Sequence, residues 1–358
     1  MQSKFWSLLV LFSVVVLPVV VAGSLPSLQV VQAAGPTPEA TPQPHGNPLD
    51  VMPVIAAVDL PEGGTLQVVA TTATVAQVVD KVGGDAIQLT GLIQPGQDSH
   101  AYQPTPRDVA AMTQADLLFI NGAGLEEFMH DIMDNLQGKV TIVPVSAGIN
   151  LIPGHHHEHD ADELDADEHD ADEHDADELD ADEHAFDPHT WTSPANVMTW
   201  VDNIEAALSS ADPAHAAAFK ANADAFRSEL KQADDWAQEA VGQVPPEKRK
   251  IVTNHESWNY FAGHYGFEQV GTVVPAVTSS VEPSAQDFAA LTRTLKDQGV
   301  SVLFIDYEVN PALSETIANE VGAKVVRIWH DISPQGEGAD TYVDWLHYNV
   351  NQFVDHLK

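Results

Sequence analysis

Histidine and carboxylate side chains, which coordinate divalent metal ions, occur in two arrangements along this sequence. In the dense arrangement, a five-residue unit, Asp-Ala-Asp-Glu followed by His or Leu, repeats five times over residues 160–184. This insert and the residues before it contain seven histidines: His155, His156, His157, His159, His169, His174 and His184. Many weak, flexible sites raise the local concentration of a metal ion near any tighter site. The insert is therefore predicted to be an accessory collector of Zn²⁺, with a solubilising acidic segment as the alternative.

The insert has no pattern that could build a core. A period of five matches neither the 3.6 residues of a helix turn nor the alternation of a strand, and its dense charge has one sign. Disorder over residues 154–185 is therefore expected. Neighbouring carboxylates favour the imidazolium form of each histidine, so metal binding by the insert should weaken as pH falls.

In the second arrangement, single metal ligands lie far apart, next to predicted elements. His100 is in a loop after a strand, His189 precedes a helix, and His255 and Asp331 follow strands. Ligands of open parallel sheets bind beyond the carboxyl ends of the strands, and these positions fit that rule. Taken alone, a histidine in a loop is more often a surface or turn residue than a metal ligand, and Asp331 could equally be the cap of a short turn. Three imidazoles and one carboxylate would complete a tetrahedral Zn²⁺ site with no open position, which favours binding over catalysis.

The elements around these residues alternate between strand and helix, which predicts parallel sheets flanked by helices. Strands are predicted at 66–72, 86–93, 116–122 and 139–146 in a first lobe, and at 250–256, 267–274, 301–308 and 323–328 in a second. A helix beginning at Asp212-Pro213 continues without a breaker to Gly242, long enough to act as a rigid rod between lobes. The predicted fold is α/β, with two lobes bridged by one long helix.

The predicted boundaries follow changes in composition. They are a signal peptide or anchor at 1–34, a Pro-rich linker at 35–64, a first lobe at 65–210, the connecting helix at 211–243 and a second lobe at 248–358. The N-terminal segment has a lysine followed by a short apolar run, which is typical of export; cleavage and retention as an anchor both stay open. We expect the protein to work at the periplasmic or extracellular face of the cell membrane.

Composition excludes several classes of function. The 358 residues carry a formal net charge of −38, and sixteen of the 53 acidic residues lie in the insert. Phosphate binding needs clustered lysine and arginine, so a nucleic-acid partner is excluded. The sequence has no cysteine. Disulfides, thiolate metal sites and a lipid-modified N-terminal cysteine are therefore excluded as well.

Several motifs together resemble the zinc and manganese group of metal-binding substrate-binding proteins of ABC importers. They are "DSHAYQPTPRDV", "NGAGLEEF", "DPHTWTSPANV", "VTNHESWNYFAGHYGF" and "ADTYVDWLHYNV". The resemblance covers residues 65–358 apart from the insert. It implies two α/β lobes joined by a long helix, the ligands His100, His189, His255 and Asp331, and a monomer that delivers Zn²⁺ to a permease and an ATPase. It also implies that the protein is not an enzyme.

The third ligand position separates the subgroups of this family, because manganese members have a carboxylate there. His255 at this position favours Zn²⁺, since Mn²⁺ prefers oxygen ligands. "WHDISP" is looser than the other motifs, so His330 or a water could stand in place of Asp331. Asp187 is a candidate partner for a ligand imidazole. The alternatives are a manganese or iron receptor of the same family, a zinc buffer or adhesin without a transporter, and a zinc hydrolase.

Overall fold

The computed structural model describes residues 51–61, 63–154, 186–274, 276–279 and 283–358. The predicted signal or anchor, the part of the Pro-rich linker before Val51, and the histidine-rich insert lie outside these residues. No helix among the described residues is both long and apolar enough to cross a membrane.

The first lobe is built on a parallel sheet with the strand order β2-β1-β3-β4. Its strands are β1 (Leu66–Ala70), β2 (Ile87–Gly91), β3 (Leu117–Ile120) and β4 (Thr141–Pro144). Its helices are α1 (Ala73–Gly83), α2 (Pro106–Gln114) and α3 (His130–Leu136). In the central strand β1, Val68 is paired with Leu89 of β2 on one side and Leu117 of β3 on the other. All four carboxyl ends therefore point to the same edge.

The second lobe contains two pairs of parallel strands. They are β5 (Lys250–Thr253) with β6 (Glu268–Thr272), and β7 (Val302–Asp306) with β8 (Lys324–Ile328). The helices are α6 (Asn259–Tyr265), α7 (Ala285–Asp297), α8 (Ala312–Val321) and α9 (Tyr342–Leu357). The predicted α/β class with parallel strands and flanking helices is confirmed, although the strands of this lobe form two short sheets.

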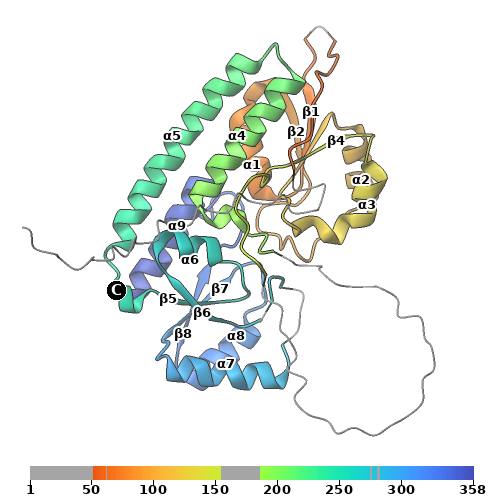
Figure 1. The fold of residues 1–358 in the computed structure, drawn as a ribbon. Coiled ribbons are helices and arrows are strands. Elements are labelled where there is room, and N and C mark those ends of the chain that lie inside the picture. The colour runs from red at the N-terminus through yellow and green to blue at the C-terminus, as the bar shows by residue number, and fades with distance from the viewer. Residues whose placement is uncertain (1–50, 62, 155–185, 275, 280–282) are drawn as a thin grey trace, which may run out of the picture. The chain divides into compact units, whose positions relative to one another are not determined.

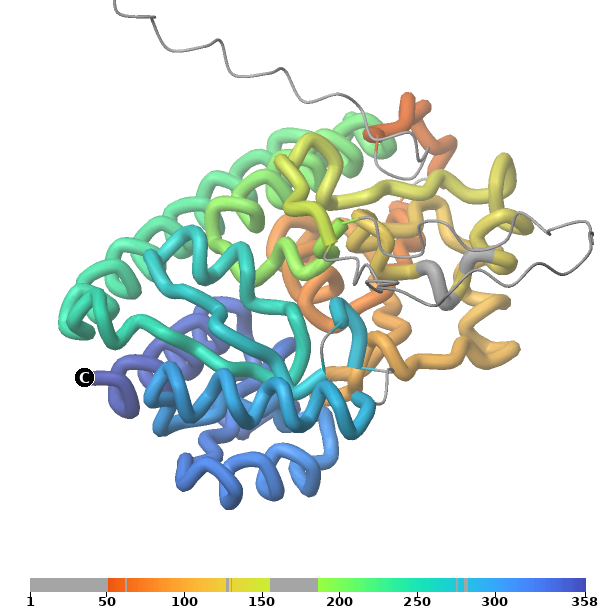
Figure 2. The backbone as a smooth tube through the Cα atoms, turned by 60° about the horizontal axis from the view of Figure 1, so that its bottom comes forward, coloured from red at the N-terminus to blue at the C-terminus, as the bar shows by residue number. Residues whose placement is uncertain are grey.

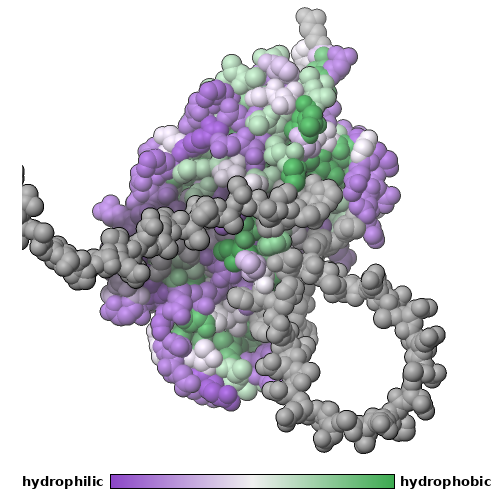
Figure 3. Space-filling view, in the orientation of Figure 1, coloured by the Kyte–Doolittle hydropathy of each residue, from purple (hydrophilic) through white to green (hydrophobic). Residues whose placement is uncertain are grey.

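A long helix, α5 (Ala216–Val241), runs antiparallel to α4 (Pro194–Ala211), as Figures 1 and 2 both show. Its 26 residues span about 39 Å at 1.5 Å per residue. Its buried residues recur every three or four positions, from Phe219 to Ala240, and the helix packs against α1 and α4 of the first lobe and α9 of the second. Its outer face is hydrophilic in Figure 3.

One hydrophobic core continues through both lobes. It includes Val68 of the first sheet, Phe226 of α5, Phe304 of β7 and Trp345 of α9, all buried. Smaller clusters lie on the far side of the sheet in each lobe. Because the lobes share a core as well as a long helix, large independent movements of one lobe against the other would expose apolar surface and are disfavoured.

The local structure differs from the prediction at two helix starts. Residues 125–136, whose spacing in the sequence predicts one helix, are divided into a 3-10 turn, Leu125–Met129, and α3, with Glu126 at non-helical φ −89° and ψ 19°. The buried Glu126 carboxylate accepts bonds from the amides of Asn121 and Gly122, which fixes this kink. The helix predicted to begin at Asp212-Pro213 starts at Ala216, because Asp212 instead forms a turn with the amide of Ala214 and Nδ1 of His215.

Candidate metal centre

Three of the predicted site residues lie together at the carboxyl ends of the strands. His100 is in the loop between β2 and α2, His189 is in the turn before α4, and His255 is the second residue after β5. One ligand atom from each of these histidines lies within 4.8 Å of the other two. His189 and His255 are almost completely buried, and His100 is half-buried. The chain therefore brings together three imidazoles from segments up to 155 residues apart.

The three rings approach through the same nitrogen. Nε2 of His189 lies 3.0 Å from Nε2 of His100 and 3.3 Å from Nε2 of His255. Two nitrogens bound to one tetrahedral Zn²⁺ at about 2.0–2.1 Å are themselves about 3.3 Å apart. The observed separations match a set of nitrogens that surrounds one small ion.

A carboxylate holds the His189 ring from behind. Asp187 Oδ1 lies 2.7 Å from His189 Nδ1 and accepts the His189 amide at 2.9 Å, while Oδ2 accepts Nδ2 of Asn259 at 3.0 Å. Burial raises the pKa of Asp187 to about 6, and these hydrogen bonds oppose the rise. Because this pKa is still below 7, the carboxyl group is mainly ionised at neutral pH. An Nδ1–H donated to the carboxylate leaves the Nε2 lone pair free to coordinate a metal ion.

His255 also has a buried carboxyl group behind it, which the sequence did not predict, but no hydrogen bond joins the two. Oδ2 of the buried Asp306 lies 3.5 Å from His255 Nδ1. Burial lowers the pKa of His255 and raises that of Asp306. The neutral imidazole is the form that binds metal, so His255 needs little proton release. Asp306 is the last residue of β7, and the rule that ligands gather at carboxyl ends of strands applies to it as well.

Asp331, the fourth residue predicted for the site, does not belong to the group of converging ligand atoms. Its Oδ1 accepts hydrogen bonds from Oγ1 of Thr74 and, at 2.7 Å, from the amide of Ile332. Burial raises the pKa of Asp331 to about 6. The adjacent residue, His330, also lies outside this group of ligand atoms, but its ring lies beside those of His189 and His255, with centroids 5.0 and 4.9 Å away.

Comparison with known proteins identifies the family. The family model described as "Zinc-uptake complex component A periplasmic", ZnuA, matches residues 68–356. The chain belongs to the ZnuA family of metal-binding substrate-binding proteins of ABC importers. The predicted family resemblance is thus confirmed.

Relatives within the ZnuA family are named for different metals. The manganese-binding lipoprotein MntA of Halalkalibacterium halodurans is 28% identical over 83% of this chain and 90% of its own. The iron-binding protein YfeA of Yersinia pestis is 25% identical over 79% of this chain and 84% of its own. The periplasmic zinc-binding protein TroA from Treponema pallidum is 25% identical in sequence. Its solved structure superposes with a TM-score of 0.69, over 82% of this chain and 99% of its own. Membership of the family therefore indicates a metal ion but not which one.

Hydrogen bonds hold the two lobes together around the histidines. Tyr260 of α6 donates to the carbonyl oxygen of Asp187 at 2.8 Å, and Trp191 Nε1 donates to the carbonyl oxygen of His330 at 2.9 Å. Ser279 Oγ donates to Asp98 Oδ2 at 2.5 Å, two residues before His100. These bonds place the second lobe directly over the ligand loops of the first.

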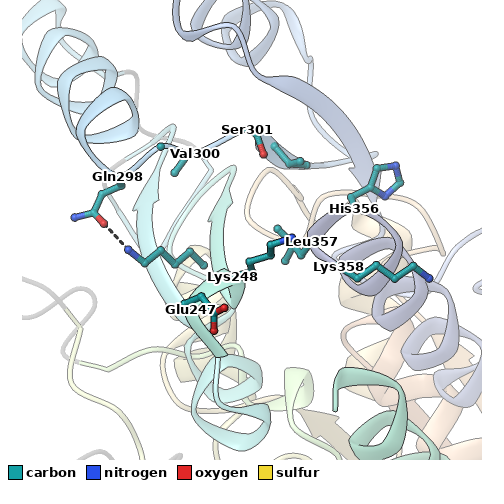
Figure 4. A pocket seen from close by; sticks show the side chains of 11 residues that line it. Glu247, Lys248, Gln298, Val300, Ser301, His356, Leu357 and Lys358 are labelled. Carbon is teal, nitrogen blue, oxygen red and sulfur yellow. Dashed lines mark hydrogen bonds between the residues drawn. The ribbon is translucent and has the colours of Figure 1, made fainter. Parts of the chain in front are cut away.

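A separate pocket of about 280 Å³ lies at the C-terminal edge of the second lobe (Figure 4). Its polar lining includes Lys248, Lys250 and Lys358, and Lys250 Nζ donates to Gln298 Oε1 at 2.6 Å. It contains none of the four histidines described above. Its cationic lining is unsuited to a metal ion, so the buried histidine group is the better candidate for binding one.

Proposed function

We propose that the protein captures Zn²⁺ between its two lobes outside the cytoplasm and delivers it to the permease and ATPase of an ABC importer. His100, His189 and His255 act as ligands in this proposal. The observation that carries it is the convergence of three Nε2 atoms at separations that suit one tetrahedral ion. Membership of the ZnuA family supports delivery to an importer.

The choice of Zn²⁺ over Mn²⁺ or Fe²⁺ rests on the chemistry of the ligands. All three converging atoms are imidazole nitrogens, and the described residues supply no carboxylate to this group. Imidazole suits Zn²⁺, whereas Mn²⁺ prefers carboxylates, carbonyls and water. Relatives named for manganese and iron make a receptor for one of those metals the main alternative.

Binding rather than catalysis is supported by the closure of the site. Catalytic zinc sites keep one position for a water or substrate, and that position must be reachable. Here His189 and His255 are at most 1% exposed, and the lobes are hydrogen-bonded across the ligand loops. A receptor, unlike a hydrolase, gains by surrounding its ion completely. We therefore propose that the protein is not an enzyme.

The remaining parts of the chain have accessory roles in this proposal. The seven histidines of the insert, which lies outside the described residues, collect Zn²⁺ at weak sites close to the main one. The apolar segment near the N-terminus directs export, and the mature protein acts as a monomer at the outer face of the membrane. Several relatives are named lipoproteins, which supports a location at the membrane, but this chain has no cysteine to carry a lipid, so any attachment would come from its apolar N-terminal segment.

Competition titration tests the proposal. Zn²⁺, Mn²⁺ and Fe²⁺ are titrated anaerobically against a chromophoric chelator, using the wild type, His189→Ala and the control His264→Ala. His264 also bonds to a carboxylate, Asp234, at 2.8 Å, but lies outside the converging group. We expect tight Zn²⁺ binding that is lost only in His189→Ala. Tighter binding of Mn²⁺ or Fe²⁺, or wild-type affinity in His189→Ala, would contradict the proposal.

A further inference from the structure

We propose that His330, and not Asp331, supplies the fourth ligand, so that the ion is held by four imidazoles. This inference rests on the proposed metal-binding function and specifies the ligand set of that site. It departs from the assignment of a carboxylate to the fourth position. Three independent features of the described residues support it.

The first feature is the spacing of the rings. Four imidazoles bound to one tetrahedral ion at about 2.0–2.1 Å have ring centroids roughly 5 Å apart. Within the three-histidine group the centroid distances are 5.2, 5.3 and 5.0 Å. His330 adds distances of 5.0 Å to His189, 4.9 Å to His255 and 6.3 Å to His100. Five of the six distances already fit, and a small shift of the half-buried His100 would correct the sixth.

The second feature is an unpaired nitrogen. The His330 side chain is buried, yet its Nε2 has no hydrogen-bond partner. Burying a polar group without a partner costs on the order of 1–3 kcal/mol, and an ion bound at this nitrogen would offset that cost. The backbone of His330 is held next to the three histidines, since its carbonyl oxygen accepts from Trp191 Nε1 and its amide donates to Glu308 Oε2. Neither ring nitrogen of His330 belongs to the group of converging ligand atoms, so the ring would have to turn towards the other three histidines for an ion to satisfy Nε2.

The third feature is that Asp331 is already engaged. Its Oδ1 accepts both the hydroxyl of Thr74 and the amide of Ile332. Turning it towards the ion would break the bond to Thr74. Because Thr74 is on α1 of the first lobe, that turn would also remove one of the bonds between the lobes. Asp331 is therefore better suited to holding the lobes together than to binding metal.

Four neutral ligands leave the charge of a divalent ion to be balanced by groups behind them. Asp187 lies behind His189 and Asp306 behind His255, which places two buried carboxyl groups next to ligand rings. Asp187 is within hydrogen-bond distance of the His189 ring and raises the basicity of that imidazole, whereas no hydrogen bond joins Asp306 to His255. A site with four nitrogens and its negative charge one shell further out favours Zn²⁺ over Mn²⁺ more strongly than a site with a direct carboxylate.

X-ray absorption at the zinc edge tests this ligand set, because multiple scattering counts bound imidazoles. The full-length protein is loaded with less than one equivalent of Zn²⁺, so that the tight site fills before the weak sites of the insert. The matched variants are His330→Ala and Asp331→Ala, which remove adjacent side chains. We expect four imidazoles in the wild type and in Asp331→Ala, but three in His330→Ala, with Zn²⁺ affinity at least about 100-fold lower in the last variant.

The possible outcomes separate this inference from the function on which it rests. Three imidazoles and one oxygen in the wild type, or an unchanged spectrum and affinity in His330→Ala, would overturn the role of His330 alone. The wild-type count decides the question even if His330→Ala does not fold. Absence of a tight Zn²⁺ site in the wild type would overturn the proposed function itself.

Discussion

Asp187 Oδ1 lies 2.7 Å from Nδ1 of His189, and neither side chain is exposed to solvent. The carboxylate therefore selects the tautomer and the orientation of a ring whose Nε2 is central to the converging group. The same pairing occurs at the surface, where Asp212 Oδ2 lies 2.5 Å from Nδ1 of His215, whose side chain is 47% exposed. The two pairs share their chemistry but only one is next to the candidate metal centre.

We predict that Asp187→Asn lowers Zn²⁺ affinity about 10- to 100-fold, the effect typical of losing a carboxylate partner of a ligand histidine. The asparagine still accepts a bond from Nδ1, but it no longer supplies negative charge. Competition with a chelator measures the affinity, and Asp212→Asn is the matched control with no expected effect. Equal affinities in the two variants would show that Asp187 has only a structural role.

Removal of residues 155–184 should leave the tight site intact and abolish only additional weak binding. The converging histidines are contributed by segments on either side of the insert and by the second lobe, so none of them is deleted. Isothermal titration should show a high-affinity phase in both proteins and a low-affinity phase only in the full-length chain. Loss of the high-affinity phase would assign the main site to the insert.

The fold and most of the converging residues were predictable because they follow simple periodic rules. Alternating strand and helix patterns predicted the parallel strands, and the uninterrupted run after Asp212 predicted α5. His100, His189 and His255 could be selected because parallel strands direct their carboxyl ends to one edge. Each rule depends only on residues that are near one another in the sequence.

The choice between His330 and Asp331 could not be made in this way. Both residues follow β8, and the direction of each side chain depends on partners elsewhere: Thr74 for Asp331, and the histidine group for His330. The kink at Glu126 has the same origin, since a buried carboxylate that accepts Thr71 and two amides interrupts a segment with good helical spacing. Such contacts are set by tertiary packing and leave no local pattern.

Glu126 should make the stability of the metal-free protein depend on pH. Burial raises the pKa of Glu126 from 4.5 to about 7, although Thr71 and backbone amides oppose the shift. Between these values the folded protein holds a proton that the unfolded chain releases, so the free energy of unfolding falls as pH rises through this window. The contribution is roughly 3 kcal/mol, at 1.36 kcal/mol per pKa unit.

Glu126→Gln, which has no charge to titrate, should flatten this part of the pH dependence. Denaturant unfolding at intervals from pH 4.5 to 8, with a chelator present, compares the variant with the wild type. Other buried acids contribute equally to both proteins, so the difference between the two curves isolates Glu126. Parallel curves over the whole range would rule out its proton uptake.

The bond from Thr74 to Asp331 connects α1 of the first lobe to the segment after β8 of the second. Thr74→Val preserves the shape of the side chain but removes the donor to a buried carboxylate, which should cost about 1–3 kcal/mol of stability. With one fewer bond between the lobes, release of Zn²⁺ should become faster. Thr74→Ser keeps the hydroxyl and should behave like the wild type.

Stopped-flow transfer of Zn²⁺ to an excess of chelator measures the release rate, and thermal unfolding without metal measures the stability. The direction of the rate change also distinguishes two roles for Asp331. If this carboxylate holds the lobes together, as the inference about His330 requires, Thr74→Val releases zinc faster. If Asp331 binds the ion, the loss of a competing donor frees the carboxylate for the metal, and release becomes slower.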